Sequence, residues 1–577
     1  MQEDEIKLHV PDTARKAIID RLRALAGPRR QRMCAIYFDT PDGALGTRRA
    51  ALRVRLEGRR WVQTFKMEGA SLLSRLELNH ERPGPEPDLT LYRGTPAEPV
   101  LSTLQDRLGA RYETDFYRLR REVHTRFGTL EVAYDAGVIR AGTLEMPLYE
   151  VEFERVSGQT RAVFDLARQW VREYGLVLDL RSKAERGDGL ARIEAEAMQA
   201  PVEQRASVRE QALARLHAAP GMRVPDLSAD VMAAEPVLEK ITGACFVQIA
   251  RNAALLAMAG KLPGAPGQVH EYVDQLHDSL GRLRAMWRLF DGLADLPAIG
   301  VRLQARAHAR RLEEMRQHQR LMCTLLPALQ RAGMPPVELP RGPDTDDPAA
   351  IVGSPDFQVW LLDLMAWSTG ERASAAAARM TVEGLGQGAR IGDHDPDPPA
   401  SQAAAPKRRA GAHAEARDNK TGNAGGDELA AAMSAPTASV TAGENLNAGG
   451  TLEIRLAKWH KRLVRAARRV AAADEAAWDA LRRQVERLLD GSELVASWQG
   501  GKRLKRYRRR LVKLHWLLNE RHSLVAARTR LGALVEAQPQ AWFACGWMTA
   551  RLEKLEPRIQ KVLRKLPDTF PAPRAKS

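Results

Sequence analysis

The stretch that decides the fold is Glu3-Asp4-Glu5-Ile6-Lys7-Leu8-His9-Val10, near the start of a chain of 577 residues. Successive side chains of a β-strand point to opposite faces, so a strand with this sequence has two different faces. One face carries Glu3, Glu5, Lys7 and His9, and the other carries Ile6, Leu8 and Val10. The run predicts a strand that is charged on one side and aliphatic on the other.

Later segments repeat this alternation with the same residue types. They lie at residues 51–56, 64–66, 75–79, 118–120, 131–135 and 150–154. Clusters of Gly, Pro and Asp separate them, for example at residues 41–43 and 82–85. Such clusters are typical of turns, so the N-terminal part of the chain predicts about eight short antiparallel strands, each with one charged face.

Two structures fit a set of strands with charged faces. The first is an open antiparallel sheet whose charged face meets water. The second is a closed barrel with a charged interior, in which acidic and basic strands meet across a lumen. Arg and Lys would then surround phosphate oxygens, and Asp and Glu would hold a hard divalent cation such as magnesium.

Six segments resemble a known family in sequence and in order: EDEIK (3–7), IYFDTPD (36–42), LRVR (52–55), TDFYR (114–118), YEVEFE (149–154) and SKAERG (182–187). They resemble the CYTH domain of the triphosphate tunnel metalloenzymes, in particular the inorganic triphosphatase type that is fused to a CHAD domain. The resemblance covers residues 1 to about 200. It implies an eight-stranded tunnel that hydrolyses linear triphosphates with Mg²⁺ or Mn²⁺.

The resemblance also implies roles for individual residues. The phosphate-binding set would be Lys7, Arg53, Arg55, Lys66, Arg75, Arg118, Arg120, Lys183 and Arg186. The metal-binding set would be Glu3, Glu5, Asp135, Glu150 and Glu152. Lys7, Glu5, Arg53 and Arg55 would be the catalytic residues. Asn79 stands where the family often has a second acid, which predicts an altered metal preference.

Composition and charge agree with an intracellular enzyme of anionic substrates. The net charge of +16 indicates polyanionic partners. Four cysteines lie far apart without a CxxC pair, which argues against disulfides or a zinc site and favours the cytoplasm. The acidic N-terminus has the wrong sign for a secretory signal, and no apolar run is long enough for a membrane span. We therefore expect a cytoplasmic protein with no membrane partner.

The strand pattern stops near residue 202, and the sequence predicts an α+β protein of several domains. We expect the β-tunnel at residues 1–201 and a connecting helix at 202–229. An all-α helical bundle follows as two repeats, at 230–384 and 451–577. Residues 385–450 are rich in Pro, Gly and small polar residues and lack core formers, so we expect a disordered linker there.

The second repeat carries basic rows at helical spacing. One row is Arg455, Lys458, Arg462, Arg465 and Arg469, and the other is Arg503, Arg506, Arg510 and Lys513. Solvated helix faces would show the same pattern, but two rows without interleaved acids favour a surface for a flexible polyanion. No stacking aromatics alternate with them, which makes nucleic acid an unlikely partner.

The helical half resembles the CHAD domain, an α-helical module that binds inorganic polyphosphate, in residues 273–290, 478–489 and 514–520. It departs from the family at Asp274, His277, Gly281 and Asp479, where histidines or basic residues are usual. A carboxylate repels phosphate, so binding of polyphosphate on this face is in doubt. The expected reaction is hydrolysis of inorganic triphosphate to pyrophosphate and phosphate. Adenylate cyclase activity, thiamine triphosphatase activity and a non-enzymatic polyphosphate-binding role remain open alternatives.

Overall fold

The computed structural model describes residues 2–24, 29–69, 74–104, 107–222, 225, 227, 233–262, 266–339, 347–371, 448–470, 474–498 and 501–571. Most of the expected linker, residues 385–447, lies outside the described residues. All four cysteines are free thiols, as their spacing predicts. Within the described ranges, no helix combines the length and the apolar character that a membrane crossing needs.

The first eight strands form a closed antiparallel barrel. They are β1 (Gln2–His9), β2 (Arg29–Asp39), β3 (Ala50–Glu57), β4 (Arg60–Glu68), β5 (Ser74–Arg82), β6 (Gly109–Thr125), β7 (Gly128–Ala141) and β8 (Leu144–Gly158). Their order in the sheet is β5-β4-β3-β2-β6-β7-β8-β1, and a pairing between β1 and β5 joins the two ends. The closed barrel, rather than the open sheet, is therefore the structure of this chain.

Strand β1 closes the barrel by dividing its pairings along its length. Residues 2–4 pair with residues 74–76 of β5, and residues 5–9 pair with residues 150–154 of β8. A ninth strand, β9 (Val177–Leu178), pairs with Leu8 and His9. The sequence predicted eight strands and missed β9, because two residues are too few to show an alternating pattern.

Strand β1 turns its aliphatic face to the hydrophobic core and its charged face to the barrel interior, as the alternation predicts. Ile6 and Leu8 are fully buried in a hydrophobic core with Leu22 of α1 (Arg15–Ala24) and Trp170 of α4 (Arg161–Tyr174). These helices therefore cover the outside of the barrel, and the charged residues of the strands are left on the inside.

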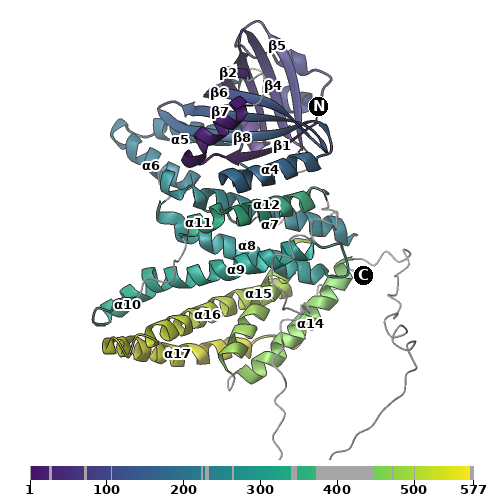
Figure 1. Ribbon diagram of the computed structural model, residues 1–577. Helices are drawn as coiled ribbons and strands as arrows, with labels where there is room; N and C mark the ends of the chain where they lie inside the picture. The colour runs from purple at the N-terminus through teal and green to yellow at the C-terminus, as the bar shows by residue number, and fades with distance from the viewer. Residues whose placement is uncertain are drawn as a thin grey trace, which may run out of the picture.

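The remainder of the chain is helical. Short helices α2 (Ala44–Thr47) and α3 (Glu98–Leu101) lie between strands, and α5 (Lys183–Gln199) and α6 (Arg205–Leu216) follow the barrel. The bundle contains α7 (Ala234–Ala257), α8 (Val269–Phe290), α9 (Ile299–Arg320), α10 (Leu326–Arg331), α11 (Pro348–Gly353), α12 (Pro355–Ser368), α14 (Ala448–Arg469), α15 (Glu475–Trp498), α16 (Lys502–Gly532) and α17 (Trp542–Leu563). Figure 1 shows the barrel at one end of the molecule, above a layer that contains α7 and α12, with α14, α16 and α17 at the other end.

The barrel and the bundle share one hydrophobic core. Helix α4 packs on α12, and a single cluster of buried residues extends from Phe153 and Trp170 to Phe357 and Trp360. Polar contacts also cross the junction: Arg168 Nε donates to Asp363 Oδ1 at 2.7 Å. The two halves therefore meet through a packed interface rather than through a tether alone.

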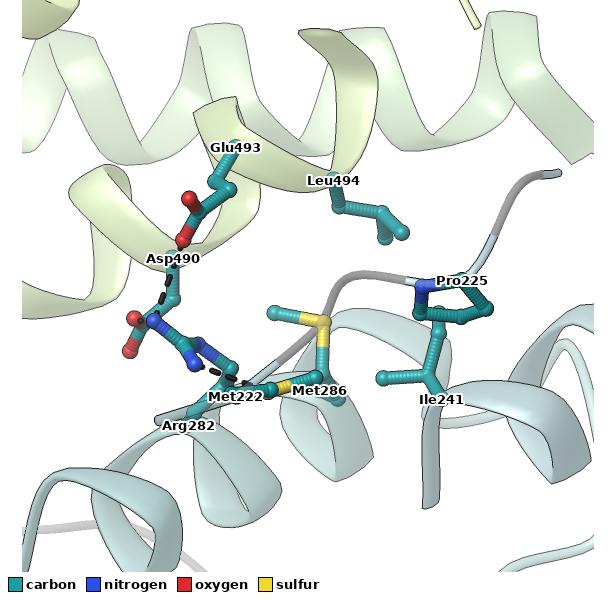
Figure 2. Close-up of a pocket in the computed structure, with 8 residues that line it drawn as sticks. All are labelled: Met222, Pro225, Ile241, Arg282, Met286, Asp490, Glu493 and Leu494. Atoms are coloured by element: carbon teal, nitrogen blue, oxygen red, sulfur yellow. Dashed lines mark hydrogen bonds and ion pairs between the residues drawn. The ribbon is translucent and has the colours of Figure 1, made fainter. Parts of the chain in front are cut away.

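A half-buried arginine joins the two parts of the bundle that flank residues 372–447. Figure 2 shows Arg282 of α8 pointing toward Asp490 and Glu493 of α15, which its guanidinium approaches at 3.3 and 3.0 Å. Burial raises the pKa of Asp490 well above its usual value, although the charge of Arg282 opposes the shift. The small cavity beside them has a volume of about 10 Å³, which is room for one water molecule.

Gln358 makes buried hydrogen bonds at the junction between the barrel and the bundle. This fully buried side chain accepts a hydrogen bond from the Leu178 amide at 2.8 Å and donates to the Val352 carbonyl at 2.6 Å. We expect Gln358→Leu to lower the free energy of unfolding by about 1–3 kcal/mol, because both backbone groups lose their buried partner. Urea denaturation followed by circular dichroism measures the change.

The matched control is Gln540→Leu at an exposed contact with the Pro336 carbonyl. A surface substitution of this kind should change stability by less than about 0.5 kcal/mol. Equal losses in the two variants would contradict a role for Gln358 in joining the barrel to the bundle.

Candidate functional site

Acidic side chains from two neighbouring strands meet inside the barrel. The register places Asp135 of β7 opposite Glu150 of β8, and Glu152 follows on the same face. One oxygen of each carboxylate lies within 4.8 Å of the others, and Asp135 is completely buried. Three hard carboxylate oxygens at this spacing fit a divalent cation such as Mg²⁺ or Mn²⁺ rather than a softer metal.

Basic side chains hold the same three carboxylates. Arg118 of β6 donates to both oxygens of Asp135 at 2.8 and 2.7 Å and also pairs with Glu152. Lys183 Nζ lies 2.8 Å from Asp135 and 2.9 Å from Glu152, and it contacts Glu150 as well. Arg186 pairs with Glu150. The carboxylates that fit a cation are therefore held by cationic side chains of the protein itself.

The start of α5 places Lys183 and Arg186 at the acidic cluster. Ser182 caps the helix, since its Oγ accepts a hydrogen bond from the Glu185 amide at 3.0 Å. Lys183 and Arg186 are one turn apart, so both side chains leave the same face of the helix toward the carboxylates. Each side chain is 8% exposed.

Opposite charges shift the pKa values of Glu152 and Lys183 in the direction that favours their charged forms. Burial on its own would raise the pKa of Glu152, but the charges of Lys183 and Arg118 outweigh burial and hold that pKa well below its usual value. Burial would likewise lower the pKa of Lys183, but Asp135 and Glu150 raise it above its usual value. The arrangement therefore places opposite charges at close range, paired with one another.

A second group of basic residues lines the strands on the other side of β1. Arg55 of β3 donates from Nε to Glu57 at 2.7 Å, and Lys66 of β4 pairs with Glu77 of β5. Burial, reinforced by the neighbouring charge of Arg53, lowers the pKa of Arg55 to about 10. Arg55 and Lys66 are therefore each held by a neighbouring carboxylate, as Arg118 and Lys183 are.

The charged face of β1 lies between these two groups. Lys7 Nζ is 3.0 Å from Glu5 Oε1, and the register sets Lys7 opposite Glu152 and Glu5 opposite Glu154. Burial and the charge of Glu5 raise the pKa of Glu154 to about 7. Glu5 therefore forms a second acidic pair with Glu154, beside the cluster of Asp135, Glu150 and Glu152.

The structure brings together most of the predicted residues. The charged network includes Glu5, Lys7, Arg53, Arg55, Lys66, Arg118, Asp135, Glu150, Glu152, Lys183 and Arg186. Arg120 stands apart: it is 36% exposed and pairs with Glu131 at 3.3 Å. The backbones of Glu3 and Arg75 pair across β1 and β5, but their side chains lie outside the described residues.

Asn79, expected to alter the metal preference, makes hydrogen bonds within the barrel. Its Oδ1 accepts from Thr64 Oγ1 at 2.7 Å, and its Nδ2 donates to Glu77 at 3.0 Å. The Asn79 amide is therefore held by Thr64 and Glu77, and the altered metal preference stays a prediction.

Sequence reasoning missed Tyr37 and Glu57. Arg53 Nη1 donates to Tyr37 Oη at 3.4 Å, and the Tyr37 ring stacks on Tyr112 with 4.6 Å between centroids. Burial would raise the pKa of the Tyr37 phenol, but Arg53 outweighs burial and lowers it. Tyr37 lies in the IYFDTPD segment, where alternation with Ile36 and Phe38 gave no sign that an aromatic ring faces the charged interior.

On the helical half, carboxylates of α9 and α15 lie against histidines and arginines of the same bundle. Glu313 of α9 accepts from His277 and His522, each at 3.1 Å, and pairs with Arg316. Asp479 of α15 pairs with Arg482 at 2.9 Å and with Arg483. We call this surface, formed by His277, Glu313, Arg316, Asp479, Arg482 and His522, the inner face. Its positive charge is largely neutralised from within.

The outer basic rows of α14 and α16 are only partly available to a ligand. Arg455 donates to the carbonyls of Leu289 and Asp291 at the end of α8, and Arg510 donates to the Lys565 carbonyl after α17. These two arginines therefore cap helices. The exposed members are Lys458, Arg462, Arg465 and Arg469 on α14, and Arg503, Arg506 and Lys513 on α16. His460 and Tyr507, joined at 2.9 Å, hold the two helices together.

Both halves of the chain match known protein families. A family model for the CYTH domain matches residues 1–215, and a model for the CHAD domain matches residues 240–532. An inorganic triphosphatase from Haemophilus influenzae is 34% identical over 159 residues, which are 26% of this chain and 44% of that protein. This chain therefore spans less than half of that relative.

Two solved structures are also similar. The CHAD domain from the plant Ricinus communis has 19% identity and a TM-score of 0.39, over 61% of this chain and 99% of that one. A putative adenylyl cyclase from Hippeastrum, described as having a dominant triphosphatase activity, has 20% identity and a TM-score of 0.24, over 33% of this chain and 95% of that one.

The CHAD model alone spans about half of the chain, and the CYTH model spans the closed barrel with the helices that follow it. This chain therefore belongs to the proteins that join an N-terminal CYTH domain to a CHAD domain.

Proposed function

We propose that the barrel hydrolyses inorganic triphosphate to pyrophosphate and phosphate with the help of Mg²⁺ or Mn²⁺. The observation that carries the proposal is the cluster of Asp135, Glu150 and Glu152 beside Arg118 and Lys183. A site for a triphosphate and its cation needs both signs of charge within a few ångströms, and this interior supplies them. The curated relative that matches the barrel acts on inorganic triphosphate.

In this mechanism the cations of the barrel bind and align the substrate. Arg53, Arg55 and Lys66 would contact the phosphate chain on one side, and Arg118, Lys183 and Arg186 on the other. Guanidinium groups grip phosphate oxygens in pairs, and an aligned chain presents one phosphorus for in-line attack. Lys7, between the two groups, would position the attacking water, and Glu5 would keep Lys7 in place.

Asp135, Glu150 and Glu152 would hold the divalent cation, and Glu3 and Glu5 complete the proposed metal-binding set. The cation would stabilise negative charge on the phosphoryl oxygens. A cation held there would take over the neutralisation of these carboxylates, and Arg118, Lys183 and Arg186 would then be available to phosphate oxygens.

A substrate panel tests the proposal. Phosphate release is measured with inorganic triphosphate, thiamine triphosphate, ATP and long-chain polyphosphate, each with Mg²⁺ or Mn²⁺. We expect the largest kcat/KM with inorganic triphosphate. Faster turnover of thiamine triphosphate, or formation of cyclic AMP from ATP, would move the assignment to the corresponding enzyme on the same fold. No turnover of any of the four would favour a non-enzymatic phosphate-binding role.

Glu152→Gln removes one carboxylate of the proposed metal site and keeps the shape of the side chain. We expect it to lower kcat/KM for triphosphate at least about a hundredfold, because cation stabilisation of the phosphoryl group is worth several kcal/mol. The matched control is Glu145→Gln on the same strand, where an exposed carboxylate pairs with Arg140 at 2.6 Å outside the network. Wild-type turnover by a folded Glu152→Gln protein over a range of Mg²⁺ concentrations would disprove the metal assignment.

We further propose that polyphosphate binds the helical half through the exposed basic rows of α14 and α16 rather than through the inner face. The inner face uses its own carboxylates to neutralise Arg316 and Arg482. The outer rows keep exposed cations on two adjoining helices, which suits a flexible polyanion.

The measurement is a titration of the full-length protein with long-chain polyphosphate at low and high salt. We expect affinity to fall steeply with salt, because exposed charges are screened beyond about 8 Å at physiological ionic strength. The double variant Arg462→Gln/Arg506→Gln should weaken binding, and Arg483→Gln, which removes a partner of Asp479 on the inner face, should not. The opposite order of effects would place the polyanion on the inner face.

A further inference from the structure

A cavity of about 90 Å³ lies at the junction between the barrel and the bundle. The basic side chains that line it are Arg181 before α5, Arg186 on α5 and Arg251 on α7. Glu185 is the one acidic residue of its lining, and Met146 and Leu255 contribute apolar walls. Its volume suits several water molecules or one small oxyanion, but not a long phosphate chain.

The three guanidinium groups are held in place with donors to spare. Arg181 uses Nε and Nη2 to contact Asp179 at 3.0 and 2.8 Å, and Arg186 uses Nη2 to contact Glu150 and Nε to reach the Ser182 carbonyl. Nη1 of each makes no hydrogen bond to a described residue. Since a guanidinium carries five N–H donors, both retain donors for a further acceptor.

Arg251 contributes the charge from the bundle. Its two Nη atoms contact Glu185 at 2.6 and 2.9 Å, while its Nε is buried and has no hydrogen-bond partner among the described residues. Glu185 is 43% exposed, so its carboxylate has room to turn toward solvent. A buried donor without a partner is unfavourable, and an acceptor in the cavity would satisfy it.

We propose that this cavity is a second anion site, which adjoins the interior of the barrel at Arg186, and that it takes a single tetrahedral oxyanion such as orthophosphate. Three arginines converge on a volume of that size, and arginine is the side chain best suited to hold phosphate oxygens in pairs. The apolar walls limit water and so strengthen each charged contact.

The site requires both domains. Arg181 and Arg186 belong to the segment that completes the barrel, and Arg251 belongs to the first long helix of the bundle. An anion bound there would contact both and would stabilise the junction by mass action. Glu185 is the lining group that opposes it, since its carboxylate competes for Arg251 and repels an anion.

The test is a calorimetric titration of the full-length protein with orthophosphate, without divalent cations and in a buffer free of sulfate. We expect Arg251→Gln to weaken binding at this site at least about tenfold, because a charge-assisted contact is worth about 1.5–3 kcal/mol. Glu185→Gln should instead tighten binding about threefold or more, because it removes like-charge repulsion. A merely structural Arg251–Glu185 pair predicts no gain in affinity.

The matched control is Arg168→Gln, which removes another arginine that crosses the junction but does not line the cavity. It should bind orthophosphate as the wild type does. Arg251→Gln should also leave the affinity for pyrophosphate and the turnover of triphosphate unchanged, because both depend on the barrel interior. The readout is binding without turnover, so this result is independent of the proposed triphosphatase activity.

Two outcomes would overturn the proposal. In the first, Arg251→Gln binds orthophosphate with wild-type affinity, so that all binding belongs to the barrel interior. In the second, Glu185→Gln binds orthophosphate more weakly than the wild type, so that the ion pair supports the fold and not a ligand. Melting temperatures measured with and without orthophosphate show whether each variant is folded.

Discussion

The pairing of buried opposite charges inside the closed sheet is the constraint on which this structure depends. A barrel closed by β1 removes the edges of the sheet, but it also takes the charged faces of its strands out of bulk water. Unpaired charges in such a place would cost more than the sheet could recover. Asp135, Glu150 and Glu152 are tolerable there because Arg118, Lys183 and Arg186 lie against them. The same pairing keeps positive and negative charges close together, and the proposed binding of a triphosphate with its cation needs both.

The period of two along the strands allowed most of the barrel to be predicted. It separated Glu5 and Lys7 from Ile6 and Leu8, and the family resemblance supplied the order of the segments. This alternation does not show which side chains from other elements contact the charged face of a strand. Lys183 and Arg186 reach the acidic cluster from a helix, whose position depends on the Ser182 cap and on the packing of α5, and Tyr37 faces inward without an alternating polar neighbour. Tertiary packing decides these contacts, so a local pattern does not reveal them.

In the helical half as well, the sequence pattern did not reveal which contacts the basic residues make. Arg455 and Arg510 belong to regular rows in the sequence, yet each caps the end of another helix. Asp274 and Asp479 suggested a weakened face, and the structure shows how the neutralisation occurs: Arg316 lies 3.9 Å from Asp274, and Arg482 and Arg483 pair with Asp479. Helical spacing identifies which residues share a face, but it does not show which neighbouring helix has already used their charge.

The contact between α8 and α15 has a consequence for how this protein can be encoded. Arg282 joins Asp490 and Glu493 across a long stretch of sequence, and Arg455 joins α14 to the end of α8. These contacts, with the shared core around them, do not require a peptide connection between residues 371 and 448. The segments on either side, made as two separate polypeptides, would therefore assemble into the same bundle. A gene divided at this point could specify the same architecture as an intact one.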